Sequence, residues 1–411
     1  MIAHILAQCF LSFFLLYDGT VETRSSFGFT GRAGAPACVV KGRIYVIGGE
    51  VANGVAVNTV EIYDPQTDTW ATPQTTGTFT PRKYLTAAVV DDKIYAIGGW
   101  HDGAASDLVE VFDPSTNSWS TPKTTGTFTP RWALTSSAVN GKIYVMGGYN
   151  FTNGALNTLE IFDPATSTWS SLVETNFMTT RQYASSSVVD NKIYVIGGTG
   201  NDASTALNTL EIFDPAKGSW STPKTTGSMT VRYGLSTSVL NGHIYAIGGT
   251  DRNGNFLNTF EMFDPSTDTW STPIIDGSVT VREYLSSCTV DGKIFMMAGW
   301  DGTEVMSNQV YIPTPSASVS HKSGPDFHVQ SWPNPAQGTI NISYHIPEEG
   351  SVAFRFYNTL GKTVALVNPG TMDAGDHELT FDASSLAAGV YYFQLSTPQN
   401  SYTGSFVIQK R

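Results

Sequence analysis

The sequence predicts an all-β chain in which six similar units, each of four short strands, are followed by a small C-terminal β-sandwich. Three observations support this prediction. A phrase of the type Ile-Tyr-Ala-Ile-Gly-Gly recurs along most of the 411 residues, an arginine and a tryptophan recur with the same step of 49 to 51 residues, and the composition changes after Pro313. An internal repeat of this length is typical of folds that stack one supersecondary unit against the next.

Three series of residues keep one register through the repeat. The second glycine of each pair stands at Gly49, Gly99, Gly148, Gly198, Gly249 and Gly299. The arginine stands at Arg32, Arg82, Arg131, Arg181, Arg232 and Arg282. The tryptophan stands at Trp70, Trp119, Trp169, Trp220 and Trp270. Three residue types do not stay in step over so long a stretch by chance, so we expect them to be structural.

Each unit reads as four strands separated by turns. The first strand follows the arginine, as in RKYLTAAVV, and a tight turn such as DDK or NGK leads to the second strand, IYAIGG. A loop leads to the third strand, TVEIYDP or TLEIFDP, and a turn of the type DPxTxT precedes the tryptophan strand. Alternating β-branched and aromatic residues between Gly, Asn, Asp and Pro are typical of strands and turns. The Asp-Pro pairs therefore indicate turn starts rather than catalytic carboxylates.

The paired glycines, the Glu-aromatic-Asp segment and the tryptophan together resemble the kelch repeat over about residues 32–313. The resemblance implies that each unit is one blade of a β-propeller, and that the six units form a six-bladed ring. One blade cannot bury both faces of its sheet, so the unit is repeated until the ring closes.

The last unit lacks the Asp-Pro pair and the fourth-strand tryptophan of the other units, so its fourth strand must come from elsewhere or leave a sheet edge exposed. Trp70 stands twelve residues before Arg82, and the residue twelve before Arg32 is Thr20. We therefore expect residues 19–24 to supply the outer strand of the last blade and to join the two ends of the ring.

The N-terminus carries an apolar run from Ile5 to Tyr17, which is shorter than the roughly 20 residues that a membrane span needs. It predicts a secretory signal peptide, with a buried strand as the alternative. No basic residue precedes the run and no clear cleavage site follows it, and no later segment is long enough to span a bilayer.

After Pro313 a Pro/Ser-rich linker leads to short strands that do not follow the spacing of the repeat. These strands predict a small β-sandwich. The segments WPNP, FYNTLGK, AGDHELTFD, LAAGVYYFQL and FVIQKR, in this order, resemble the C-terminal sorting domain of type IX secretion substrates. This resemblance implies export through the periplasm and outer membrane, with the secretion machinery as a partner and the cell surface or the medium as destination. An ordinary adhesive sandwich is the alternative. The expected division is a signal peptide at 1–18, the propeller at 19–313, the linker at 314–327 and the sorting domain at 328–411.

The net charge of −12 and the absence of any basic run argue against a nucleic-acid partner. Three cysteines match no metal site, and we expect no cofactor and a monomer. Cys38 and Cys288 each stand six residues after the arginine of their unit, in the first and last blades. Two buried thiols are expected there, and a disulfide between the neighbouring blades is the alternative.

Strand parity places the blade-to-blade connectors and the loops after the glycine pairs on one side of the ring. Loops on a rigid scaffold are the usual place of recognition. Aromatic rings between polar groups suit a sugar or a peptide, whereas the alternative is that these rings only pack between blades. The candidate ligand-binding residues are Tyr84, Trp100, His101, Trp132, Tyr149, Tyr183, Tyr233, Glu283, Tyr284 and Trp300.

A group that recurs in every blade is expected to hold every blade. The arginines should therefore pair with carboxylates of the third strand rather than form an anion site. The candidate partners are Glu61, Glu110, Glu160, Glu211 and Glu261. In the last blade, counting by the same spacing puts Tyr311 where the glutamate should be.

Some kelch proteins are enzymes. A copper site similar to that of galactose oxidase is excluded, because His101 and His243 are the only propeller histidines and fall on opposite faces. A resemblance to six-bladed sialic-acid mutarotases would give Glu283 acid–base chemistry together with Arg232 or Tyr284. The sequence favours a secreted or cell-surface module that binds a glycan or an extracellular protein, with a carbohydrate epimerase or mutarotase as the alternative.

Overall fold

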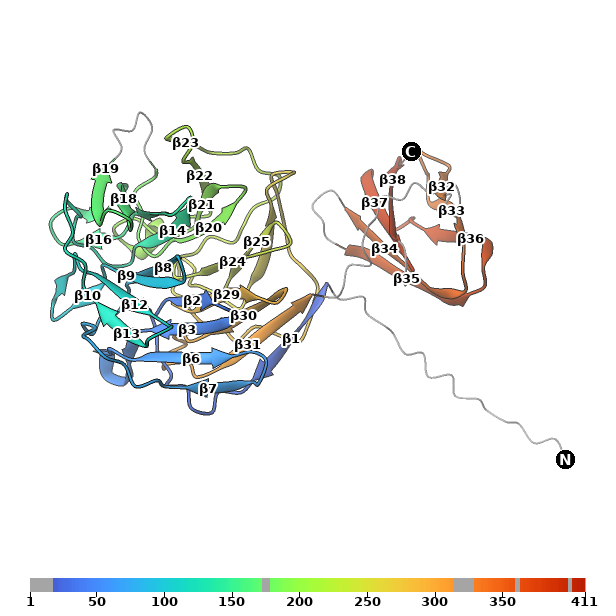
Figure 1. Ribbon diagram of the computed structural model, residues 1–411. Helices are drawn as coiled ribbons and strands as arrows, with labels where there is room; N and C mark the ends of the chain where they lie inside the picture. Colours follow the sequence, from blue (N-terminus) through green and yellow to red (C-terminus); the bar gives the residue numbers. More distant parts are fainter. Residues whose placement is uncertain (1–17, 172–177, 314–328, 359–362, 398–400, 411) are drawn as a thin grey trace. The chain divides into compact units, whose positions relative to one another are not determined.

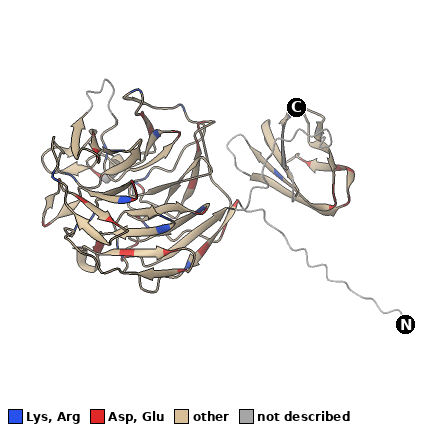
Figure 2. Cartoon of the chain, viewed as in Figure 1, with Lys and Arg blue, Asp and Glu red and all other residues tan. Residues whose placement is uncertain are grey.

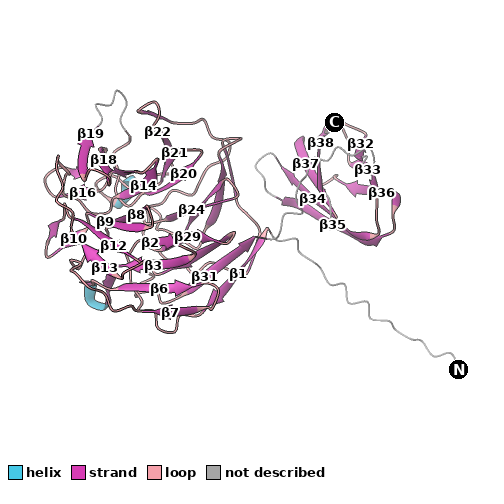
Figure 3. Cartoon of the chain, viewed as in Figure 1, coloured by secondary structure: helices cyan, strands magenta, loops and turns pink. Residues whose placement is uncertain are grey.

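The computed structural model describes residues 18–171, 178–313, 329–358, 363–397 and 401–410. The expected linker and all but the last residue of the expected signal peptide lie outside this part. Gly19–Pro313 forms one compact unit, and the residues after Pro313 belong to a second. The described elements are strands apart from two short 3-10 segments, η1 (Ala52–Gly54) and η2 (Ala203–Thr205) (Figure 3).

The first unit is a six-bladed propeller, which confirms the predicted fold class (Figure 1). Blade one comprises β2 (Ala37–Val40), β3 (Arg43–Ile47), β6 (Val60–Asp64) and β7 (Thr69–Ala71). Blade two comprises β8 (Thr86–Val90), β9 (Lys93–Ile97), β12 (Val109–Asp113) and β13 (Ser118–Ser120). Blade three comprises β14 (Thr135–Val139), β15 (Lys142–Met146), β18 (Leu159–Asp163) and β19 (Thr168–Ser171).

The remaining blades follow the same order. Blade four comprises β20 (Ser185–Val189), β21 (Lys192–Ile196), β22 (Leu210–Asp214) and β23 (Ser219–Ser221). Blade five comprises β24 (Ser236–Leu240), β25 (His243–Ile247), β26 (Phe260–Asp264) and β27 (Thr269–Ser271). Blade six comprises β29 (Ser286–Val290), β30 (Lys293–Met297), β31 (Asn308–Pro313) and, from the N-terminal side, β1 (Gly19–Arg24).

The second strand of each blade is covered on both faces. In β9, the consecutive residues Ile94, Tyr95, Ala96 and Ile97 are all buried. Successive side chains of a strand point to opposite faces, so both faces of this strand must be packed against neighbouring blades. The repeated apolar phrase of the sequence is the consequence of this double burial.

The recurring tryptophans lie on the outer strands and are buried. In blade two, Trp119 stacks on Phe79 of the preceding connector, with ring centroids 4.2 Å apart, and packs at 5.1 Å on Phe112 of β12. Blades one and three repeat this sandwich with Trp70 and Trp169. The tryptophan therefore attaches each outer strand to the connector that enters the same blade.

The outer strand of blade six is β1, which runs antiparallel to β31 over six residue pairs from Gly19–Pro313 to Arg24–Asn308. Val21 lies opposite Tyr311, in the position that the tryptophan occupies in the other blades. The prediction that Thr20 occupies this position is therefore wrong by one residue. A short strand, β28 (Ile275–Asp276), pairs in parallel with the start of β1 and covers its edge.

The paired glycines stand where neighbouring blades come closest. The Gly49 amide donates to the Arg82 carbonyl oxygen at 2.8 Å, each blade repeats this bond to the next, and Gly299 to Arg32 completes the circle at 2.8 Å. Gly49 has a φ of +90°, and a Cβ there would lie 2.6 Å from the Cβ of Ala35. The second glycine is therefore required both by its backbone conformation and by the close approach of Ala35, which lies in the connector that enters the same blade.

We expect Gly249→Ala to destabilise the propeller more than Gly254→Ala. Both residues have positive φ, +100° and +82°, so both substitutions are strained, at a cost of about 1–2 kcal/mol. A Cβ at Gly249 would also lie 2.7 Å from the Tyr233 carbonyl oxygen, whereas nothing lies within 4 Å at Gly254. This clash should cost Gly249→Ala about 1–3 kcal/mol more in urea unfolding. Equal losses would show that close approach is not what the glycine serves.

Cys38 and Cys288 are free thiols in the structure. Cys288 packs against the core between blades six and one, whereas Cys38 belongs to the core between blades one and two. The two thiols therefore belong to different cores. Burial raises the pKa of Cys38 to about 12, so this thiol is protonated and unreactive at neutral pH.

The second unit consists of two packed sheets. One contains β32 (Val329–Trp332), β33 (Thr339–Ile346) and β36 (Gly375–Asp382). The other contains β35 (Thr363–Met372), β34 (Gly350–Asn358), β37 (Gly389–Ser396) and β38 (Ser401–Ile408). Inward-facing residues of both sheets form one core, in which Phe356 and Phe381 stack at 3.8 Å. Among the described residues, no helix is long and apolar enough to cross a bilayer.

Candidate functional site

One side of the propeller carries both the connectors and the loops after the glycine pairs, and we call it the loop-rich face. The two sets of segments pair directly, as Lys83 with Trp100 and Glu283 with Trp300. In blades one to three, the loop after the glycines forms a small hairpin. The hairpins are β4–β5 (Glu50–Val51, Val55–Ala56), β10–β11 (Trp100–His101, Ala104–Ala105) and β16–β17 (Tyr149–Asn150, Gly154–Ala155).

A closed ring of backbone hydrogen bonds surrounds the axis on this face. It joins the residues that stand two positions after each arginine, and all six have φ between +52° and +64°. Each amide donates to the carbonyl of the preceding blade, at 2.7 to 3.2 Å. In chain order the six residues are Gly34, Tyr84, Ala133, Tyr183, Gly234 and Tyr284. Small residues and tyrosines therefore alternate around the axis.

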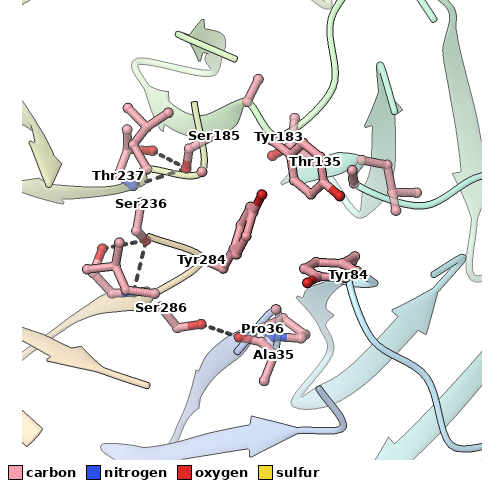
Figure 4. A pocket seen from close by; sticks show the side chains of 18 of the residues that line it. Ala35, Pro36, Tyr84, Thr135, Tyr183, Ser185, Ser236, Thr237, Tyr284 and Ser286 are labelled. Atoms are coloured by element: carbon pink, nitrogen blue, oxygen red, sulfur yellow. Dashed lines mark hydrogen bonds between the residues drawn. The ribbon is translucent and has the colours of Figure 1, made fainter. Parts of the chain in front are cut away.

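The three tyrosines, which we call the tyrosine triad, project toward one another over the axial pocket (Figure 4). Their ring centroids are 5.6 Å apart for Tyr84–Tyr183, 5.2 Å for Tyr84–Tyr284 and 4.9 Å for Tyr183–Tyr284. The left-handed conformation costs a side-chain-bearing residue about 1–2 kcal/mol, and glycine avoids this cost. Tyrosine at three of these positions is thus retained against a local backbone penalty, which is typical of functional sites.

The triad borders a cavity of about 200 Å³ at the mouth of the axis. All six blades contribute to its wall, which consists of backbone, small apolar side chains and hydroxyl groups. The hydroxyls also join neighbouring inner strands, as Thr135 with Ser186 at 2.7 Å and Ser236 with Ser287 at 2.8 Å. No charged side chain is among the described residues that line this cavity.

Two buried carboxylates lie next to the triad. Glu50 accepts hydrogen bonds from the Tyr84 hydroxyl and from the Lys83 ammonium, with which it forms an ion pair. Glu283 accepts from the Thr250 hydroxyl at 2.6 Å and lies near the Tyr284 hydroxyl. Glu283 is 7% exposed, and burial raises its pKa above the usual range of a carboxyl group. Burial, reinforced by the neighbouring Glu50 in the case of Tyr84, also raises the pKa of the Tyr84 and Tyr284 hydroxyls.

A second group of rings, which we call the aromatic cluster, covers the loops of blades two and three. It consists of Trp100, Trp132, Tyr149 and Phe151. Trp100 and Trp132 meet edge to face at 4.6 Å, and Phe151 contacts both while remaining 73% exposed. The indole of Trp132 lies beside the Tyr183 hydroxyl, which brings the cluster next to the triad. A continuous aromatic strip therefore runs from the exposed Phe151 to the axis.

The structure divides the predicted ligand-binding residues into three groups. Tyr84, Tyr183, Tyr284 and Glu283 lie at the axis, with Tyr233 at 6.3 Å from Tyr183. Trp100, Trp132 and Tyr149 form the cluster. The other two have backbone roles: the His101 Nδ1 lies 2.9 Å from the Pro81 carbonyl oxygen, and Trp300 pairs through its backbone with Glu283 and Glu304. Phe151 was not predicted, although an aromatic residue two positions after Tyr149, in a loop that follows the glycine pair, was a usable signal.

The six arginines are all fully buried, and in blades one to five they pair with the third-strand glutamates. Arg232 is held by Glu261 and the Gly248 carbonyl, so it does not reach a substrate and is ruled out as a catalytic partner of Glu283. In blade six the partner of Arg282 is the Gln309 amide oxygen, at 2.8 Å. The assignment of Tyr311 to the glutamate position is therefore wrong, because the loop of blade six is shorter and Gln309 occupies it.

Charged side chains are spread over the blades rather than gathered into one basic patch (Figure 2). Among the described residues, no group of His, Cys, Asp and Glu is arranged to hold a metal ion. The described part of the loop-rich face therefore carries aromatic rings, hydroxyls and the buried carboxylates Glu50 and Glu283.

Comparisons with known families agree with this architecture. The model of the KLHDC2/KLHL20/DRC7 Kelch-repeats domain matches residues 20–198 and 183–323, and the model of the secretion system C-terminal sorting domain matches residues 330–409. No curated protein matches the chain. The sorting domain directs export by type IX secretion to the cell surface or the extracellular space. The chain belongs to the kelch-repeat family, as a secreted kelch propeller with a type IX sorting domain at its C-terminal end.

Proposed function

We propose that the propeller is a recognition module that binds an extracellular glycan or protein through its loop-rich face. The observation that carries this proposal is the aromatic strip from Phe151 to the tyrosine triad. Aromatic rings supply large contact areas at small entropic cost, and they dominate the energetics of binding surfaces. A phenylalanine that is 73% exposed at the end of such a strip gains from being covered by a ligand.

The hairpin that presents Phe151 is held rigid, which suits a binding surface. The Asn150 side chain donates to the Pro130 carbonyl oxygen at 3.2 Å and accepts from the Asn153 amide at 2.8 Å. From the next blade, the Asn201 side chain accepts the Ala155 amide at 2.8 Å. A surface ordered before binding loses less conformational entropy when the ligand arrives.

We expect Phe151→Ser to weaken ligand binding about tenfold or more, as is usual for an aromatic hot spot. The purified protein would be screened on a glycan array and against a panel of extracellular proteins, and the affinity for each hit would be compared between variants. Phe27→Ser is the matched control, because Phe27 is 91% exposed but lies in the segment beside the outer strand of blade one. Equal affinity of the two variants would contradict a ligand site on the loop-rich face.

One observation favours a carbohydrate epimerase or mutarotase as the second candidate. Glu283 is a buried carboxyl group with a raised pKa, next in sequence to Tyr284, which lines the axial cavity, and a general acid or base needs a pKa shifted in this way. An anomerisation assay on free sugars separates the candidates. Turnover that Glu283→Gln abolishes would favour the enzyme, and binding without turnover would favour the recognition module.

A further inference from the structure

We propose that the axial end of the binding face holds an organic cation, such as the ammonium group of a lysine side chain in a bound protein. This inference rests on the proposed recognition function and names the chemical group that the axis selects. Three features of the described residues carry it: the tyrosine triad, the two carboxylates next to its hydroxyls, and the cavity beside it.

The triad places three aromatic rings at the cavity where a cation would lie. Rings from three different blades converge within 4.9 to 5.6 Å of one another, and they border a cavity of about 200 Å³, which is large enough for an alkylammonium group. An ammonium group is attracted to the negative face of an aromatic ring within about 6 Å, and several rings together form a cage for it. The ring of backbone hydrogen bonds fixes all three tyrosines before a ligand arrives.

The hydroxyls of the triad increase this attraction. The Tyr84 hydroxyl donates to Glu50. A phenol that donates to a carboxylate carries more negative charge on its oxygen and ring, which favours a cation against it. The Tyr284 hydroxyl lies near the Glu283 carboxylate, and the Trp132 indole lies beside the third hydroxyl, that of Tyr183.

The charge balance of the site also favours a cation. Glu50 is compensated by Lys83, but Glu283 forms no ion pair with any basic group in the described part of the chain. Arg282, its neighbour in sequence, is directed to the Ala298 carbonyl and the Gln309 amide. A buried carboxylate of this kind is stabilised by a cationic partner, and the net charge of −12 favours approach of such a ligand.

Calorimetric titration of the full chain with choline tests the inference, and 3,3-dimethylbutan-1-ol serves as the neutral ligand of the same shape. We expect choline to bind about tenfold or more tightly than the alcohol, because only choline carries the charge. An N-acetyl-lysine methylamide arm tests the peptide side chain, and a glucosamine arm tests an amino sugar as the source of the ammonium group.

Variants assign the binding to the site. Glu283→Gln should weaken choline binding about tenfold, and Tyr183→Leu should weaken it as well, because each removes one part of the cage. Asp107→Asn, in an exposed loop position, removes one negative charge elsewhere and should leave the affinity within about twofold. The far-ultraviolet circular dichroism of each variant shows that it is folded.

Three results would overturn the inference: equal affinity for choline and the alcohol, no heat of binding up to about 100 mM choline, or undiminished binding by folded Glu283→Gln. The proposed recognition function would survive any of them if Phe151→Ser still weakens binding of the hits from the array and the protein panel. Binding of glucosamine but not of the lysine derivative would assign the cation to a sugar and contradict a lysine-bearing protein.

Discussion

Arg131→Met is expected to lower the free energy of unfolding of the propeller by about 3–5 kcal/mol, because it leaves a buried carboxylate without its cation. Arg131 is 0% exposed and pairs with Glu160, which is 5% exposed. The guanidinium also donates to the Gly147 carbonyl oxygen at 3.0 Å and to the Thr158 hydroxyl at 2.6 Å. Urea unfolding followed by tryptophan fluorescence measures the loss, with the slope m as a check that the transition is unchanged.

Blade six supplies the matched control for this prediction. Arg282 occupies the same position with the same burial, but its partner is the neutral Gln309. Arg282→Met should therefore cost only about 1–3 kcal/mol, since no charge is left behind. The double variant Arg131→Met with Glu160→Met should recover most of the loss, because an apolar pair can replace a buried ion pair of similar volume. Equal losses for the two arginine variants would show that the carboxylate is not the cause.

The same contrast shows what the sequence could predict about the repeat. The period, the glycines, the arginines and their glutamate partners can be read from the sequence because every blade repeats the same contacts. The Gly49 amide, for example, bonds to the Arg82 carbonyl of the next blade, and the Cβ of Ala35 in its own blade leaves no room for a side chain at Gly49. Loop length is under no such constraint. The loop of blade six is shorter than its counterparts, so fixed spacing pointed to Tyr311 and the structure has Gln309.

The sequence predicted which face of the propeller carries the candidate site, but not how the side chains are arranged on it. Strand parity indicated the loop-rich face, and the alternation of small residues and tyrosines at the axis is visible in the sequence. The tyrosines meet at the axis because these residues have positive φ and form a closed ring of backbone hydrogen bonds. The pattern of residue types does not specify either feature. Likewise, the Thr250 hydroxyl that donates to Glu283 belongs to blade five, and only the folded ring brings the two residues together.

Deletion of residues 19–24 is the second change expected to have a large effect, because it removes β1 from blade six. The strand pairs with β31 over six residues, and hydrogen bonds of this kind contribute about 0.5–1.5 kcal/mol each. Val21 also packs into the core between blades five and six, where it stands in place of a tryptophan. We expect the free energy of unfolding to fall by about 3 kcal/mol or more, measured by urea unfolding against a chain that begins at Gly19.

The shortened chain should also self-associate. Loss of a strand that closes the ring would cause self-association, whereas loss of an unpaired terminal segment would not. Without β1, the backbone groups of β31 form an unpaired edge, and such edges pair with other chains. Light scattering should therefore show a mass that rises with concentration for the shortened chain and a constant mass for the chain from Gly19. Val21→Asp places a charge opposite Tyr311 while keeping the strand's length, and it should reproduce the loss of stability in weaker form. If the shortened chain unfolds at the same urea concentration as its control, the pairing of β1 with β31 does not hold the ring closed.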